Sequence, residues 1–247
     1  MNAPPLDLTA DIVGGWLQLP GSASAELMGS VGFGFLCVDQ QHGLIGDDAL
    51  FPMLQALDAT GTPALVRVTG NEPSAIGRAL DRGAAAVIAP LVDTAEEAAR
   101  AVEACHYPPR GGRSYGPTRA AWSPGRPDPK CIVMVETVAA VEALPEIAAV
   151  DGLDAVFVGP SDLALSSGRL PRAQDDADYE QMLSKVVSGC RDRDLPVGIY
   201  CGSPAHVRRF RELGFTFFAL QSEAAILRAA ALALLTEARE DGRASTP

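Results

Sequence analysis

This 247-residue chain has only two lysines, and its cysteines are not spaced in CxxC pairs. Each of these shortages excludes a kind of chemistry. Lys130 stands just before an apolar run and Lys185 lies inside a helix-like segment, so neither is placed to form a Schiff base with a substrate carbonyl. The five cysteines are an odd number without CxxC spacing, and three of them lie within apolar runs. We therefore expect buried free thiols, and a zinc site built from them is disfavoured.

The chain also lacks an excess of positive charge and lacks long apolar stretches. The chain has 31 Asp and Glu against 20 Lys and Arg, a net charge of −11 at pH 7, which opposes binding to nucleic acid or to anionic lipid. No window of about 18 residues is uniformly apolar, as a membrane helix would require, and the N-terminus lacks a basic start followed by an apolar stretch. We expect a soluble cytoplasmic protein whose partners are not nucleic acid or membranes.

Hydrophobic residues make up 47% of the chain, and many of them form short apolar runs rich in Val, Ile and Phe. The runs do not alternate with polar residues, which is typical of parallel strands covered on both faces. Eight runs are present, at residues 12–19, 33–39, 63–69, 84–90, 131–136, 154–160, 196–201 and 215–221. Segments with helical character lie between them, at residues 47–59, 72–82, 94–105, 138–150, 178–193 and 223–240.

Capping residues support these helices. Ser74 and Thr94 are expected as N-caps, and Glu97 completes a capping box with Thr94. Helix ends are expected at the glycines just past three of the segments, Gly61, Gly83 and Gly214.

The alternation of eight runs with helical segments predicts a single-domain (β/α)8 TIM barrel over residues 1–247. A doubly wound open sheet is the competing fold. It would need a glycine-rich phosphate loop after the first strand, and GGWLQLPGSAS fits neither GxGxxG nor the P-loop spacing. One long irregular segment, 107–129, is rich in Pro, Gly and Arg and is expected to be an active-face loop or a subunit contact. Its arginines either bind an anionic acceptor tail or form subunit contacts: Arg110, Arg113, Arg119 and Arg126.

Four charged or imidazole side chains stand where apolar runs end, which is where a barrel enzyme carries its chemistry. His42 follows the second run and is placed for proton transfer near neutral pH, although a loop histidine without a role is the plain alternative. Arg67 lies in the third run and must meet either a substrate anion or a neighbouring carboxylate. Asp81 instead ends a helical segment, where the helix dipole disfavours a carboxylate, so another use is expected.

Glu136 and Asp162 follow the fifth and sixth runs. Carboxylates at the ends of adjacent barrel strands are close enough to share a hard divalent cation, and oxygen ligands favour Mg2+ or Mn2+ over zinc. Asp162 has a second interpretation, because Ser161 and Asp162 after Pro160 make a good helix start. Backbone N–H groups near Ser161 would then point at the barrel mouth and bind a substrate carboxylate. Both interpretations can hold together.

With these residues in place, the chain resembles the HpcH/HpaI class II aldolases, a family that includes the citrate lyase β-subunit type. The similar motifs run from about Gly15 to Ala230: VDQQHG (38–43), LVRV (65–68), ALDRGAAAVIAPLVDTAEEA (79–98), YPPRGGRSYG (107–116), VMVET (133–137) and VFVGPSDLALSSG (156–168). The resemblance implies a TIM barrel, commonly a homo-hexamer, that cleaves and forms C–C bonds next to pyruvate with Mg2+, Mn2+ or Co2+.

Residue by residue, the resemblance implies that Glu136 and Asp162 are the metal ligands and that Arg67 contacts the pyruvate carboxylate and the enolate oxygen. It makes His42 the proton-transfer residue and Asp81 the carboxylate that assists it. The substrate carboxylate would bind the turn formed by Gly159, Pro160 and Ser161.

Three positions depart from the family pattern. Gln41 stands where an acid precedes the histidine, Met134 where a glutamine is common, and Glu223 where Asp is usual. A missing acid beside His42 removes a charge that would raise the pKa of the imidazole. Acceptor preference and rate are the properties that these departures affect most.

The function expected from this resemblance is a metal-dependent aldolase that cleaves or forms 4-hydroxy-2-oxo acids, giving pyruvate or a close 2-oxo acid and an aldehyde through a metal-bound enolate. Either His42 or a water that it holds with Asp81 is the base. A citrate or acyl-CoA type C–C lyase or synthase, an oxaloacetate decarboxylase or tautomerase, and a non-catalytic binding barrel remain alternatives on the same scaffold.

Overall fold

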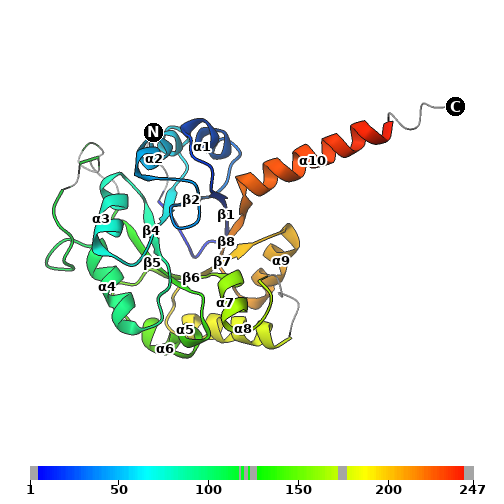
Figure 1. Cartoon of the computed structure of the whole chain (residues 1–247). Helices are drawn as coiled ribbons and strands as arrows, with labels where there is room; N and C mark the ends of the chain where they lie inside the picture. Colours follow the sequence, from blue (N-terminus) through cyan, green and yellow to red (C-terminus); the bar gives the residue numbers. More distant parts are fainter. Residues whose placement is uncertain (1–4, 117, 120–121, 123–126, 172–176, 242–247) are drawn as a thin grey trace.

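The computed structural model describes residues 5–116, 118–119, 122, 127–171 and 177–241, and these form a closed barrel of eight parallel strands surrounded by helices (Figure 1). The strands follow one another around the barrel in chain order, and the eighth pairs with the first. The predicted (β/α)8 TIM barrel is confirmed, and the open sheet is excluded.

One strand overlaps each of the eight apolar runs, and almost every strand residue is buried. Burial on both faces explains why the runs show no polar alternation. The strands are β1 Ile12–Leu17, β2 Leu36–Asp39, β3 Ala64–Arg67, β4 Ala86–Ala89, β5 Lys130–Val135, β6 Ala155–Val158, β7 Val197–Cys201 and β8 Phe217–Ser222.

All six predicted helical segments contain helix, and the segment 138–150 divides into two short helices. Helix α7 begins at Pro160, beside the helix start expected at Ser161 and Asp162, and two further helices, α1 and α9, lie in segments where none was predicted. The described helices are α1 Ser22–Gly29, α2 Asp47–Thr60, α3 Pro73–Asp81, α4 Ala95–Cys105, α5 Val138–Glu142, α6 Leu144–Ile147, α7 Pro160–Ser166, α8 Ala177–Arg191, α9 Pro204–Leu213 and α10 Glu223–Asp241.

The predicted helix ends agree with the structure except at one position. The Thr94 hydroxyl accepts a hydrogen bond from the Glu97 N–H at 3.2 Å, as expected of an N-cap. The predicted glycines adopt the left-handed conformation that ends a helix, with φ of 74° at Gly61, 101° at Gly83 and 104° at Gly214. The prediction for Ser74 is wrong, because α3 already begins at Pro73, whose fixed φ suits the first helical position.

Two apolar layers hold the barrel together. The outer layer lies between strands and helices, and the inner one fills the barrel with aromatic rings that contact one another, such as Phe35, Phe157 and Phe217. Glycine makes room for these rings, since a Cβ on Gly198 would lie 2.2 Å from the Phe217 ring. The inner layer includes Trp16 near the strand ends, where it forms the floor of the cavity described below.

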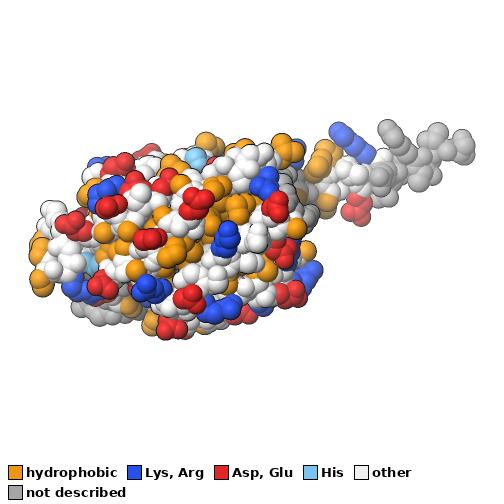
Figure 2. Space-filling model, turned by 90° about the horizontal axis from the view of Figure 1, so that it is seen from below, with side chains coloured by type: hydrophobic (Ala, Val, Ile, Leu, Met, Phe, Trp, Pro, Cys, Tyr) orange, Lys and Arg blue, Asp and Glu red, His pale blue; other side chains and the backbone are white. Residues whose placement is uncertain are grey.

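Helix α10 departs from the regular barrel arrangement. Figure 1 shows it leaving the end of β8 and projecting away from the body, and Figure 2 shows it extending beyond a surface on which acidic and basic groups are mixed. Large apolar side chains on it are exposed, including Leu227 at 64% and Leu234 at 69%. Even so, no helix in the described ranges is both long and apolar enough to span a membrane.

Candidate active site

A cavity of about 650 Å3 opens at the carboxyl ends of the strands, where the barrel was expected to carry its chemistry. His42 lies on its rim. One half is formed by residues at the ends of β3, β5 and β6: Arg67, Met134, Gly159, Pro160, Ser161 and Asp162. The other half is formed by residues at or beyond the ends of β7, β8 and β1: Trp16, Gln18, Tyr200, Gly202, His206 and Gln221. The structure therefore brings most of the predicted site residues to one place.

A buried ion pair between Arg67 and Asp39 lies beneath the cavity. Arg67 donates from Nε to one Asp39 oxygen at 2.9 Å and from Nη2 to the other at 2.6 Å, and its guanidinium stacks 5.0 Å from the Trp16 ring centroid. The two residues are direct neighbours in the register of β2 and β3. The partner of Arg67 is thus a carboxylate of the protein, while Nη1 donates a long hydrogen bond to the Met134 sulfur, at 4.0 Å.

Asp39 also organises the loop that carries His42. Its carboxylate accepts hydrogen bonds from the backbone N–H groups of Gln41 and His42, at 3.1 and 3.2 Å, and from the Trp16 indole at 3.1 Å. Burial would raise the pKa of Asp39, but the hydrogen bonds and charge of Arg67 outweigh it and hold the pKa below its ordinary value. Asp39 is therefore ionised at neutral pH and fixes Arg67 and the His42 loop relative to each other.

Glu136 lies in a contrasting environment. It is only 2% exposed, and its carboxylate accepts a hydrogen bond from the Leu91 N–H at 2.9 Å. Burial raises the pKa of Glu136 to about 7, and the charge of nearby Asp162 contributes to the rise, while the Leu91 N–H opposes it. Gly159 packs against this carboxylate so closely that a Cβ there would lie 2.5 Å from Oε2. Two carboxylates thus approach each other at the ends of β5 and β6.

This donor set fits a hard divalent cation. Carboxylate oxygens are the ligands that Mg2+ and Mn2+ prefer, and a cation between Glu136 and Asp162 would compensate the buried charge of Glu136 and relieve its repulsion by Asp162. In the part of the chain that the structure describes, no group of three or more His, Cys, Asp or Glu side chains could hold a metal ion. The remaining ligands would therefore be water and substrate oxygens, which is how Mg2+ is commonly bound.

The turn from Gly159 to Ser161 leads into α7 and lines the same half of the cavity. The buried Tyr179 hydroxyl donates to the Pro160 carbonyl at 2.9 Å and fixes this turn against α8. The helix start expected near Asp162 is present, since α7 begins at Pro160 and Asp162 lies in its first turn, and Asp162 also lines the cavity. Its role as a metal ligand stays a prediction.

Asp81 does not join the other predicted residues. It ends α3, at the end of the barrel opposite the cavity, and pairs with the Arg113 guanidinium at 2.5 Å. This buried arginine explains why a carboxylate occupies a helix end where the dipole disfavours it. The expected assistance to His42 finds no support within one chain.

The predicted active-face position of segment 107–129 also finds no support within one chain. The segment connects α4 to β5, so its described residues lie at the amino ends of the strands. There Arg119 pairs with Asp58 at 2.6 Å and Arg110 with Asp128 at 2.9 Å. Arg126 lies outside the described residues. The subunit-contact interpretation remains a prediction.

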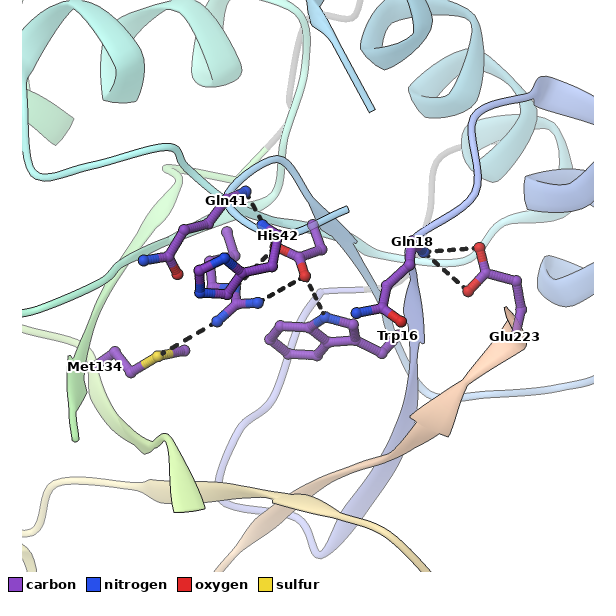
Figure 3. Close-up of polar contacts among 8 residues, drawn as sticks. Trp16, Gln18, Gln41, His42, Met134 and Glu223 are labelled. Carbon is purple, nitrogen blue, oxygen red and sulfur yellow. Dashed lines mark hydrogen bonds and ion pairs between the residues drawn. The ribbon is translucent and has the colours of Figure 1, made fainter. Parts of the chain in front are cut away.

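Sequence reasoning missed the roles of Asp39 and Glu223. Asp39 could have been found, because it ends the second run just as Arg67 ends the third, and adjacent parallel strands place such ends side by side. Glu223 was noted only as a departure from Asp. Its buried carboxylate accepts the backbone N–H groups of Gln18 and Leu19, each at 2.7 Å, and so ties the loop after β1 to the start of α10 (Figure 3).

A family profile described as HpcH/HpaI aldolase/citrate lyase matches residues 13–230. A 2-dehydro-3,6-dideoxy-6-sulfogluconate aldolase of Pseudomonas putida is 36% identical, over 90% of this chain and 91% of that protein. A hydroxypyruvate/pyruvate aldolase of Rhizorhabdus wittichii is 37% identical, over 91% and 93%. The crystal structure of the citrate synthase SbnG superposes with a TM-score of 0.86 at 25% identity, covering 95% of this chain and 96% of that one.

Proposed function

The chain belongs to the HpcH/HpaI aldolase/citrate lyase family, and from this premise we propose that it is a metal-dependent aldolase acting on 4-hydroxy-2-oxo acids. The products are pyruvate, or a close 2-oxo acid, and an aldehyde. Two relatives that cover about nine tenths of the chain are aldolases, which supports a C–C lyase.

The observation that carries the proposal is the pair of carboxylates at the ends of β5 and β6. Glu136 is buried with one hydrogen-bond donor and a raised pKa, beside an Asp162 that faces the cavity. Such a pair is destabilising by itself and becomes favourable with a divalent cation between the two groups. Mg2+ or Mn2+, with Co2+ as a further possibility, would stabilise the negative charge that develops on the substrate carbonyl oxygen.

The other residues orient the substrate and move a proton. Arg67, with two of its nitrogens held by Asp39, presents Nη1 toward the cavity for the carbonyl oxygen on which charge develops. The turn of Gly159, Pro160 and Ser161 receives the substrate carboxylate. His42, or a water that it holds, removes the proton from the C4 hydroxyl so that the C3–C4 bond breaks.

Deuterium exchange tests this proposal without knowledge of the aldehyde. The purified protein is incubated with pyruvate in D2O, with Mn2+ or with a chelator, and the methyl protons are followed by NMR. We expect exchange with Mn2+ and none with the chelator, because only the first condition stabilises the enolate. No exchange in either condition would overturn the aldolase proposal.

The likeness to a citrate synthase favours a second candidate, a citrate or acyl-CoA type lyase or synthase. The same enolate chemistry would then act on a thioester-derived or tricarboxylate substrate. Incubation with citrate, and with acetyl-CoA plus oxaloacetate, separates the candidates. Turnover of these substrates without pyruvate exchange would favour this candidate, and decarboxylation of oxaloacetate alone would favour a decarboxylase.

We also propose that the protein is a homo-oligomer, with a hexamer expected for this family. The exposed leucines of α10 and the exposed Tyr115 and Trp122 of segment 107–129 form apolar surface that association would bury. Light scattering of the purified protein tests this, and a monomer at micromolar concentration would contradict it.

A further inference from the structure

The polar side chains in the cavity half formed by β7, β8 and β1 have no role in the proposed aldolase mechanism. It is lined by hydrogen-bonding groups of Gln18, His206 and Gln221 over the aromatic rings of Trp16 and Tyr200. No Lys or Arg belongs to the described lining of this half, and the arginine of the other half is already paired with Asp39. Within the described residues of one chain, a ligand in this half meets polar groups that carry no permanent positive charge.

The backbone at the end of β8 is shaped to direct Gln221 into this half. Between β1 and β8 the register passes from Gly14–Ala219 to Trp16–Ser222, so β8 carries one extra residue. Gln221 lies in that bulge with φ of 53°, a left-handed conformation that is unfavourable for any residue except glycine. Its side-chain N–H group donates to the Gly202 carbonyl at 2.6 Å, which fixes the amide at the cavity wall. Strained backbone of this kind is typical of functional sites.

Two further groups on this wall have hydrogen-bonding capacity to spare. His206 lies in the first turn of α9, and its buried Nδ1 atom has no hydrogen-bond partner among the residues that the structure describes. Gln18 is held through its backbone, since its N–H donates to Glu223 at 2.7 Å and its carbonyl accepts from the Leu44 N–H at 2.8 Å. The Gln18 side-chain amide makes no hydrogen bond to another described residue, and Gln18 lines the cavity together with Trp16.

We propose that this wall, Gln18, His206 and Gln221, binds the hydroxyl groups of the aldehyde half of the substrate, and that the aldehyde is a short hydroxylated one without a charged tail. The inference rests on the proposed aldolase function. Amide and imidazole groups form good hydrogen bonds with neutral hydroxyls. A carboxylate buried here would lose its hydration, and no cation of this wall would offset that cost. A wall built to hydrogen-bond a hydroxyl also discriminates against analogues that lack it, because its own polar groups would be left unpaired.

Aldol addition of pyruvate to three aldehydes tests the inference: glyceraldehyde with hydroxyls, propanal of the same length without them, and succinic semialdehyde with a carboxylate. For the unmodified protein we expect the highest kcat/KM with glyceraldehyde. The variants Gln221→Met and Gln18→Met remove an amide at nearly constant volume. Each should lower the glyceraldehyde-to-propanal ratio of kcat/KM about tenfold, the size of one net hydrogen bond. Gln55→Met, on the exposed surface of α2, is the control and should leave the ratio unchanged.

Pyruvate exchange in D2O separates the two proposals. A variant that keeps its exchange rate and its propanal kcat/KM but loses its preference for glyceraldehyde supports a binding role, since a damaged fold would lower all three. Normal exchange with an unchanged ratio in both glutamine variants overturns the inference alone, as does a preference for succinic semialdehyde. An unmodified protein without metal-dependent exchange overturns the inference and the proposed function together.

Discussion

Asp39 and Glu136 are both buried carboxylates at strand ends on one face of the barrel, yet their surroundings push their pKa values in opposite directions. Asp39 receives hydrogen bonds from Arg67, Trp16 and two backbone N–H groups, and its pKa is lowered. Glu136 receives one backbone N–H, has Asp162 beside it, and its pKa is raised to about 7.

The difference indicates that the charge of Asp39 is satisfied within the protein, whereas the charge of Glu136 requires a bound ligand. All the negative charge of Asp39 is compensated within the protein, so it serves to hold Arg67 and the His42 loop in place. The charge of Glu136 has no comparable compensation, which is the condition expected of a group that meets a cation. The substitutions below test this contrast.

The largest effect is expected when the negative charge of Glu136 or of Asp162 is removed, because these two carboxylates have no comparable compensation within the protein. Glu136→Gln and Asp162→Asn should each lower the metal-dependent exchange of pyruvate protons at least 1000-fold, roughly the loss of one electrostatic catalytic group. The midpoint of thermal unfolding should not fall for Glu136→Gln, because a buried repelled charge is removed. Full exchange in both variants would exclude these residues as ligands.

His42→Ala tests the proposed proton-transfer role of the histidine whose loop is held by Asp39. Removal of the imidazole should lower the aldol cleavage rate by roughly 100- to 10,000-fold, the usual contribution of a general acid or base. The KM for pyruvate in the addition direction should change little, because His42 is not expected to bind the 2-oxo acid. An unchanged cleavage rate would assign His42 to the structure of the loop only.

Asp39→Asn breaks the buried ion pair between Arg67 and Asp39. Arg67 would become a buried charge without a partner, and we expect a loss of about 3 kcal/mol in the free energy of unfolding. For a chain of this length the unfolding midpoint should fall by roughly 6–12 °C. Asp47→Asn is the matched control, because Asp47 pairs with Arg78 and Arg82 at the surface and should cost less than about 1 kcal/mol. Equal losses in the two variants would contradict the contrast.

The smallest effect is a pH dependence of stability in the metal-free protein. Because the pKa of Glu136 is raised from 4.5 to about 7, its contribution is favourable below pH 4.5 and is lost as the pH rises through 7. Asp39 has the opposite sign, since its lowered pKa makes its contribution fall only in acid. Thermal unfolding between pH 5 and 8 should show a decrease that Glu136→Gln abolishes. The same decrease in that variant would locate its cause elsewhere.

The fold could be predicted because its signals are local and repeated. Continuous apolar runs identify strands that are buried on both faces, and Thr94, Gly61 and Gly214 mark helix ends by their own backbone chemistry. α9 was missed because its sequence, PAHVRRFREL, is rich in charge and buries few residues.

The site was only partly predictable, because it depends on which strand ends face each other. Glu136, Asp162, Arg67 and His42 stand at run ends and lie around one cavity or beside it. Asp81 stands at a helix end, which the fold places at the other end of the barrel. The hydrogen bond from the Gln18 N–H to the Glu223 carboxylate joins positions 205 residues apart, and no local sequence pattern predicts such a contact.

The central claim is tested most directly by a crystal structure of the protein grown with Mn2+ and pyruvate, with anomalous scattering used to locate the metal. The account predicts one manganese ion bound by carboxylate oxygens of both Glu136 and Asp162, with pyruvate and water oxygens completing its coordination. Manganese at a different site, or the two carboxylates turned away from a shared ion, would contradict it.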